Sequence, residues 1–331
     1  MLKLLIYSSI YLVLEINFLK AWIYMKRTKL LLFSSLLSCS FVFGQDVVID
    51  STGSKNVIEE EYVEPEEGLE TYSGTRVING HSVETLHRGV LEFRIEHRFG
   101  DLAGSSGGIN TLYGLDNVAD IRIAFEYGVT DKFMVGFGRS KGTGLPYRSL
   151  LDGFVKYRLL HQDKKGIPIS MSLLGTTSYT YMPKSSLVTD LSAFPKYVYR
   201  FAYCSQLNIA KKIGNKFSLS IMPTLVFRNY VASDDVNALF SFGMAVSYAV
   251  CPKVSLIFEY YNNIQKETVR SNYQNSLSAA VEWITFGHNF KVYLTNSAGF
   301  GETQFIPYTN TYWSKGQFRL GFCISRKYMK E

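Results

Sequence analysis

Cysteine and charged residues are both scarce in this chain of 331 residues. The four cysteines stand far apart, which excludes a disulfide framework and a zinc motif of closely spaced ligands. Charged residues make up 19%, below the roughly 25% of soluble domains. The basic residues are dispersed and form no reading motif, so the net charge of +7 does not indicate a nucleic-acid partner. Mean hydropathy is close to zero, which argues against a bundle of membrane helices.

Aromatic residues are abundant, with 23 Tyr and 23 Phe, and they recur in stretches of about ten residues that alternate apolar and polar positions. From Gly89 to Phe99, the apolar residues Leu91, Phe93 and Ile95 share one face, and charged residues occupy the other. Alternation of period two places these sets on opposite faces of a strand. A face with four charges would line an enclosed lumen, so the apolar face is expected to contact lipid.

The alternation repeats about twelve times, an even number as in single-chain bacterial outer-membrane barrels. Short connections alternate with long ones along the chain; the long ones fall near residues 100–117, 140–151, 182–196, 229–236, 262–272 and 297–315. Short turns belong to the periplasmic side and long loops to the outside. The sequence therefore predicts an all-β fold, a transmembrane antiparallel up-and-down barrel of about twelve strands over residues 88–331. The alternative is a soluble barrel with apolar side chains inside and charged side chains outside, which would show the same periodicity.

The first 45 residues predict export. A basic segment, Met25–Lys29, precedes the apolar run Leu30–Val42 and a small-residue cleavage site after Gly44 or Gln45. Residues 1–24 are then an upstream extension. The alternative, a membrane anchor over Leu4–Tyr24, is interrupted by two charged residues. We expect an outer-membrane protein of a Gram-negative bacterium, exported by a cleaved signal peptide.

Two segments separate this signal from the barrel. Residues 46–70 are acidic and poor in apolar residues, which predicts a solvated periplasmic arm with a possible periplasmic partner. Thr71 to His87 mixes turn-forming and apolar residues. This segment either folds back into the barrel as a plug or serves as a periplasmic linker.

The expected inward charges include both signs, with eight basic and five acidic residues once Glu92 is counted. They form either a selective pore lining or a paired network that fills the interior. The candidate lumen residues are Arg94, Glu96, Arg98, Arg122, Glu126, Lys156, Arg158, Arg200, Glu259, Glu282, Lys291 and Arg319. Cys204 and Cys323 also face inward in this prediction and are expected to be unpaired rather than bridged.

Several short motifs resemble an outer-membrane β-barrel family of unknown function from Bacteroidetes-type bacteria. They lie at residues 75–86, 97–100, 114–117, 136–140, 287–290 and 294–297. The resemblance spans about Thr71 to Tyr328. It implies a fold and a compartment, but it carries no reaction, ligand or functional residue.

The sequence favours a narrow pore or transporter for small polar, or anionic, solutes in contact with outer-membrane lipid. The alternative is a closed barrel that acts as a surface scaffold or binding protein through its long loops. A barrel hydrolase using His81, His97 or His288 is a third hypothesis, but none has a nearby serine on the same strand face. We therefore expect no enzyme, no catalytic residues, no cofactor and no metal site.

Overall fold

The structure is a computed structural model of the chain. It describes residues 69–329, apart from 118–119, 143–147, 164–165, 188–189 and 265–269. The described residues belong to one compact unit, Pro65–Glu331. The expected export signal and residues 46–68 of the expected acidic arm lie outside the described residues.

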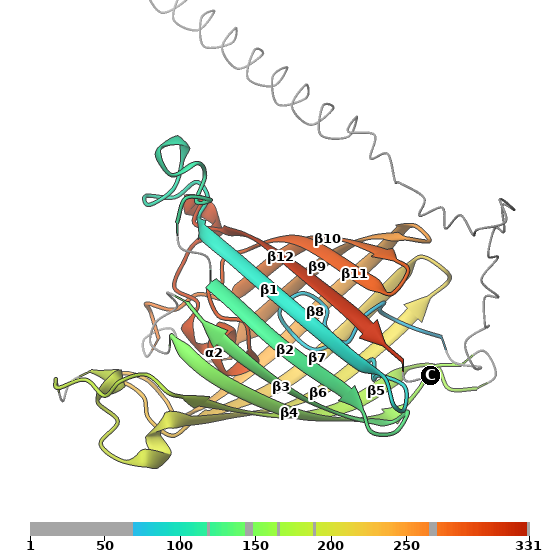
Figure 1. Cartoon of the computed structure of the whole chain (residues 1–331), viewed down its shortest axis with the longest axis horizontal. Helices are drawn as coiled ribbons and strands as arrows, with labels where there is room; N and C mark the ends of the chain where they lie inside the picture. The colour runs from blue at the N-terminus through green and yellow to red at the C-terminus, as the bar shows by residue number, and fades with distance from the viewer. Residues whose placement is uncertain are drawn as a thin grey trace, which may run out of the picture. The chain divides into compact units, whose positions relative to one another are not determined.

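Twelve antiparallel strands form a closed barrel in which each strand pairs with its sequence neighbours and β1 pairs with β12 (Figure 1). The strands are β1 (Leu91–Asp101), β2 (Asp120–Gly128), β3 (Phe133–Lys141), β4 (Ser149–Leu160), β5 (Ser170–Thr180), β6 (Phe201–Ile213), β7 (Phe217–Arg228), β8 (Ala238–Cys251), β9 (Val254–Asn263), β10 (Ser276–Thr285), β11 (His288–Thr295) and β12 (Arg319–Tyr328). Closure leaves no unpaired sheet edge, as a hydrocarbon environment requires. The predicted fold and strand number are confirmed.

The two faces of the barrel separate as the alternation predicts. Phe125, Phe240 and Phe258 are 50–56% exposed on the outer face, whereas Arg122 and Lys156 are fully buried inside. A soluble barrel would have the reverse arrangement, with apolar side chains inside and charges outside. The outward apolar surface is the one that a transmembrane barrel presents to lipid.

Most connections alternate between short turns and long loops, but the β4–β5 connection, residues 161–169, is longer than the β3–β4 connection, residues 142–148. Among the described residues, no helix has the length and apolar character needed to span a bilayer. The short helical segments all belong to the long connections: η1 (Ile109–Thr111), η2 (Leu191–Ala193), η3 (Tyr197–Arg200), α2 (Glu302–Tyr308) and η4 (Trp313–Lys315).

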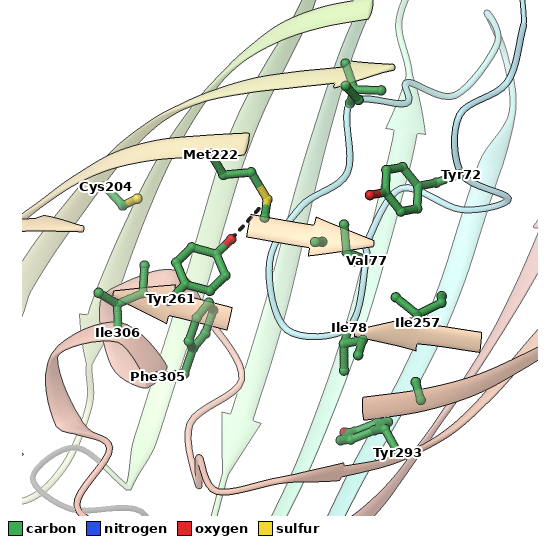
Figure 2. Close-up of a cluster of buried hydrophobic side chains, with 14 of the residues drawn as sticks. Tyr72, Val77, Ile78, Cys204, Met222, Ile257, Tyr261, Tyr293, Phe305 and Ile306 are labelled. Carbon is green, nitrogen blue, oxygen red and sulfur yellow. Dashed lines mark hydrogen bonds between the residues drawn. The ribbon is translucent and has the colours of Figure 1, made fainter. Parts of the chain in front are cut away.

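The lumen is filled by two segments that enter from opposite ends. Residues 71–86, hereafter the plug, are almost entirely buried and precede β1. Helix α2, from the loop between β11 and β12, is buried at all seven positions. Figure 2 shows Val77 and Ile78 of the plug and Phe305 of α2 within one cluster of side chains around Tyr261. In this structure, Thr71 to Leu86 therefore lie inside the lumen.

Candidate functional site

The plug contains a tight hairpin over residues 75–82. Arg76 and His81 form an antiparallel bridge, and the Val77 N–H donates to the Gly80 carbonyl at 2.9 Å. Glycine at position 80 is required by a close approach to the wall, because a Cβ there would lie 2.0 Å from the Tyr261 Oη. The hairpin thus fits the lumen closely at its tip.

Lys156 on β4 holds the two arms of the hairpin. Its Nζ donates to the carbonyls of Thr75, Ser82 and Glu84 at 3.0, 3.1 and 2.8 Å. Three acceptors satisfy all three protons of an ammonium group. Among the described residues, no carboxylate lies within ion-pair distance of Lys156, so its hydrogen bonds depend entirely on the plug.

Lys291 on β11 makes a second contact of the same kind. Its Nζ donates to the carbonyls of Arg76 and Val77 at 2.5 and 2.9 Å. It also pairs with Glu282 of the neighbouring strand β10 at 3.2 Å. Lys291 therefore joins the hairpin to the wall of the barrel.

Glu259 on β9 receives the tip of the hairpin. Its carboxylate accepts hydrogen bonds from the consecutive N–H groups of Ile78, Asn79 and Gly80 at 3.0, 3.0 and 3.1 Å. Consecutive backbone N–H groups in a turn form a concave site for an anion. Here the anion is a wall carboxylate, which otherwise would be buried without a partner.

Most of the remaining lumen charges on β1, β2 and β4 are paired. Arg122 donates to Glu96 at 2.8 Å and pairs with Asp152 at 2.6 Å. Arg94 lies 3.4 Å from Glu126 and also pairs with Glu92. Pairing offsets the high cost of burying these charges. These side chains form a network of ion pairs on this side of the lumen.

The plug joins this network through side chains. The Thr75 hydroxyl donates to Glu126 at 2.5 Å, and Arg76 lies 3.9 Å from both Glu126 and Glu302. Glu302 belongs to α2 and also accepts the His81 N–H at 3.2 Å. The plug and the loop helix therefore meet inside the barrel.

Buried apolar side chains also line part of the lumen wall on β7, β8 and β9, which sequence reasoning missed. Met222, Leu239 and Tyr261 of β7, β8 and β9 are fully buried. The Phe305 ring of α2 lies edge-on to Tyr261 at 5.0 Å, while the Tyr261 hydroxyl donates to the Met222 Sδ (Figure 2). These three residues stand at inward positions, where the alternation predicts polar side chains. The Asn79-Gly80 pair, typical of hairpin turns, was the available signal for the plug.

Most of the candidate lumen residues lie buried inside the barrel: Arg94, Glu96, Arg98, Arg122, Glu126, Lys156, Glu259, Glu282 and Lys291. Arg319 is 20% exposed and donates to the Phe99 carbonyl at 3.1 Å. Arg158 is half-buried near the β2–β3 turn and donates to the Asp131 carbonyl at 2.7 Å.

Arg200 departs from the expected position. It lies in η3, before β6 begins, and its guanidinium donates to the carbonyls of Thr180 and Met182 at 3.0 and 2.7 Å. It also lies 4.4 Å above the Phe194 ring. The expected strand began too early because the alternation continues through Tyr197–Arg200, whose backbone turns as a 3-10 helix. Arg200 therefore stabilises a long loop and is not part of the lumen network.

The three histidines of the hydrolase hypothesis lie in different places. His81 is buried in the plug, edge-on to Phe154 at 4.4 Å. His97 stacks on Phe322 of β12, and His288 lies beside Phe290 at the start of β11. The structure does not bring these three imidazoles together. In the described part of the chain, no group of three His, Cys, Asp or Glu side chains is arranged to hold a metal ion.

Burial lowers the pKa of His81 and raises the pKa of Glu84, two residues of the plug. Burial, followed by the charges of Arg76 and Lys156, holds the pKa of His81 well below its usual value. Within the part of the chain that the structure describes, neither ring nitrogen of His81 has a hydrogen-bond partner. Burial raises the pKa of Glu84, although the Thr71 N–H donates to its carboxylate at 2.8 Å. The docked plug thus favours a neutral His81 and disfavours a charged Glu84.

Hollows lie at both ends of the plugged lumen. Beside the short turns, cavities of about 550 and 230 Å³ flank the start of the plug at Tyr72 and Ser73. At the opposite end, a hollow of about 430 Å³ lies between Asp101, Asn117 and Arg319. The plug and α2 occupy the region of the lumen between these ends.

A closed twelve-stranded barrel with an apolar exterior and a charged, filled interior defines a transmembrane β-barrel protein of the outer-membrane class. The chain belongs to the family described as "Membrane bound beta barrel domain (DUF5777)", which matches residues 72–328. The predicted resemblance to a barrel family is thereby confirmed. No curated protein matches the sequence.

Solved structures with the same general fold include three bacterial barrels. The NanC porin shares 10% identity, with 73% of this chain and 100% of that chain covered and a TM-score of 0.43. The COG4313 outer membrane channel from Pseudomonas putida F1 shares 15%, with 74% and 98% covered and a TM-score of 0.40. Outer membrane phospholipase A from Escherichia coli shares 12%, with 71% and 92% covered and a TM-score of 0.41.

Proposed function

We propose that this protein is an outer-membrane pore for small polar solutes whose lumen is closed by the plug and opens when the plug is displaced. The observation that carries the proposal is the bonding of Lys156 and Glu259. Both are buried wall groups whose hydrogen bonds all go to the plug. A barrel filled permanently by its own wall would pair these charges with each other or with neighbouring strands.

The solute class follows from the wall that the plug covers. Its basic residues are Arg94, Arg98, Arg122, Lys156, Lys291 and Arg319; its acidic residues are Glu92, Glu96, Asp120, Glu126, Asp152, Glu259 and Glu282. These sets nearly balance, because Arg158 and Arg200 lie elsewhere and Asp120 and Asp152 add two inward carboxylates. The basic excess behind the anion hypothesis is thereby lost. We therefore favour polar solutes without a strong preference for anions.

Conductance in planar bilayers tests the pore. Gly80→Val introduces a side chain against Tyr261 and should expel the hairpin while leaving the wall unchanged. We expect the wild-type protein to be closed for most of the time and Gly80→Val to show stable single-channel currents. Ser73→Ala, a substitution in a half-buried part of the plug, is the matched control and should behave as wild type.

The competing function is a closed scaffold or binding protein that acts through its long loops. A filled lumen also suits that role. An expelled plug without any ion current, verified by protease access to the hairpin in Gly80→Val, would favour the scaffold. The proposal includes no catalytic step. A lipid-hydrolysis assay on the wild-type protein tests whether the barrel acts as a hydrolase.

We further propose that residues 25–45 direct export and are removed, and that the acidic arm meets a periplasmic partner. The acidic composition of residues 46–70 and the basic-apolar order of residues 25–42 support these proposals. N-terminal sequencing of protein recovered from the outer membrane tests the cleavage. Cross-linking from the arm in intact cells tests the partner.

A further inference from the structure

The wall of the lumen contacts the plug mainly through the plug's backbone. Lys156, Lys291 and Glu259 make eight hydrogen bonds to the plug, and all eight end on main-chain carbonyls or N–H groups. Main-chain groups are common to every peptide. These three wall residues therefore recognise the path of a polypeptide and not its side chains.

The three groups come from separate parts of the barrel. Lys156 lies on β4, Glu259 on β9 and Lys291 on β11, so they approach the hairpin from different sides. The ammonium groups receive carbonyls from both hairpin arms, while the carboxylate receives three consecutive N–H groups at the tip. A carboxylate bound in this way fits the concave backbone of a peptide turn.

Other contacts depend on the plug's own sequence. Asn79 donates to the Ser278 hydroxyl at 2.7 Å and accepts from Arg98 at 2.5 Å, and Thr75 bonds to Glu126. These side-chain contacts add to the main-chain set and explain how the plug, which is also tethered, outcompetes other peptides. Without the plug, the main-chain site on the wall would be vacant and buried charges would lack partners.

We propose that the lumen wall is a binding site for the main chain of short peptides, and that the plug is its intramolecular occupant. A free peptide in a turn conformation takes the place of the hairpin when the plug is displaced, with its carbonyls on Lys156 and Lys291 and its N–H groups on Glu259. This inference rests on the proposed pore function, because it names short peptides as the solutes of that pore.

Binding of a dye-labelled synthetic peptide with the sequence of residues 75–82 tests the inference, read by fluorescence anisotropy. The receptor is the full chain carrying Gly80→Val, in lipid nanodiscs. We expect saturable binding, which Lys156→Met or Glu259→Gln on the same background weakens about tenfold or more. A peptide of the same composition, shuffled around a glycine kept at the position of Gly80, should bind within about tenfold of the native order, because the main chain is unchanged and the tip still clears Tyr261. Maltotriose should not compete.

A second receptor covers the case in which Gly80→Val does not fold. Thr75→Ala combined with Asn79→Ala removes plug side-chain bonds and leaves the wall groups of the main-chain site in place. Absence of binding to a folded receptor overturns the inference, as does binding that is unaffected by loss of Lys156 and Glu259. Binding of the native peptide but not the shuffled one also overturns it, because that result assigns recognition to side chains.

The conductance experiment and the peptide-binding experiment test the pore and the peptide site separately. Peptide binding without ion current in Gly80→Val would retain the inference and remove the pore. Ion current without peptide binding would retain the pore and remove the inference.

Discussion

At the scale of single residues, Lys156 depends most strongly on the plug for its hydrogen bonds. An ammonium group buried in the barrel needs acceptors for all its protons, and the plug supplies three carbonyls. Methionine has a similar length and no charge. Lys156→Met removes these bonds and leaves three carbonyls without their donor, so it acts on the plug without opening a large void.

We predict that Lys156→Met makes plug release easier by about 2–3 kcal/mol, because each bond to a charged group contributes about 1.5–3 kcal/mol and the neutral side chain recovers part of the loss. The open fraction in planar bilayers should rise about 30- to 150-fold. Lys211→Met, on an exposed lysine at the end of β6, is the control. Equal open fractions in wild type and Lys156→Met would contradict the role assigned to this lysine.

His81 gives the plug a pH dependence. Its pKa is lowered in the docked plug, while the released plug returns it to about 6.5. The docked state therefore has full stability above about pH 6.5 and loses it as the pH falls, by up to about 1.4 kcal/mol per pH unit. The contribution of His81 alone should raise the open fraction about tenfold between pH 7.5 and pH 5.5.

Replacement of His81 by phenylalanine isolates this effect. His81→Phe retains a ring against Phe154 and cannot take a proton. Glu84 acts in the opposite direction, since its raised pKa strengthens docking as the pH falls. The difference between wild type and His81→Phe therefore reports the histidine alone. A wild-type response that persists unchanged in His81→Phe would show that another group is responsible.

At the scale of elements, α2 narrows the lumen from the loop side. Its seven residues are buried, and Phe305 packs against Tyr261. The plug closes the lumen, and α2 narrows the path that remains when the plug has left. A change in α2 should therefore have little effect on current while the plug remains docked.

Phe305→Ala tests this arrangement. On the wild-type background we expect closed barrels, because the plug still fills the lumen. On the Gly80→Val background we expect a larger single-channel conductance than with Gly80→Val alone, because a buried aromatic ring no longer narrows the path. Equal conductance of the single and double variants would place the constriction elsewhere. Gly301→Ala, where a Cβ meets no atom within 4 Å, is the control.

Strands and lumen insertions differ in how far the sequence predicts them. The strands follow from alternation, because a membrane barrel must place apolar side chains on lipid and polar ones inside at every step. The plug offers no such period. Its anchoring depends on main-chain atoms contacted by Lys156 and Glu259, which lie 72 to 181 residues away from their partners in sequence. Helix α2 is a single short stretch that contains Pro307, so no helical periodicity announces it.

At the scale of the whole molecule, the exterior decides where the barrel is stable. Phe258 lies on the outer face of β9 and is 56% exposed. An arginine facing the middle of the hydrocarbon costs about 2–4 kcal/mol in a transmembrane barrel. Phe258→Arg should therefore lower the unfolding free energy by that amount, measured by urea titration in lipid vesicles.

The control for the exterior is Phe286→Arg in the β10–β11 turn, where the side chain is 82% exposed. A charge at the interface costs about 0–1 kcal/mol, so this variant should remain close to wild type. Similar losses in both variants would contradict the assignment of the outer face of β9 to lipid.

The central claim is that residues 71–86 are docked inside the barrel through their main chain. Amide hydrogen exchange of the full chain in lipid vesicles measures this directly. The account predicts that the N–H groups of Ile78, Asn79 and Gly80 exchange at least about a hundredfold more slowly than in a free peptide, because they donate to a buried carboxylate. Exchange of these three amides at free-peptide rates would contradict it.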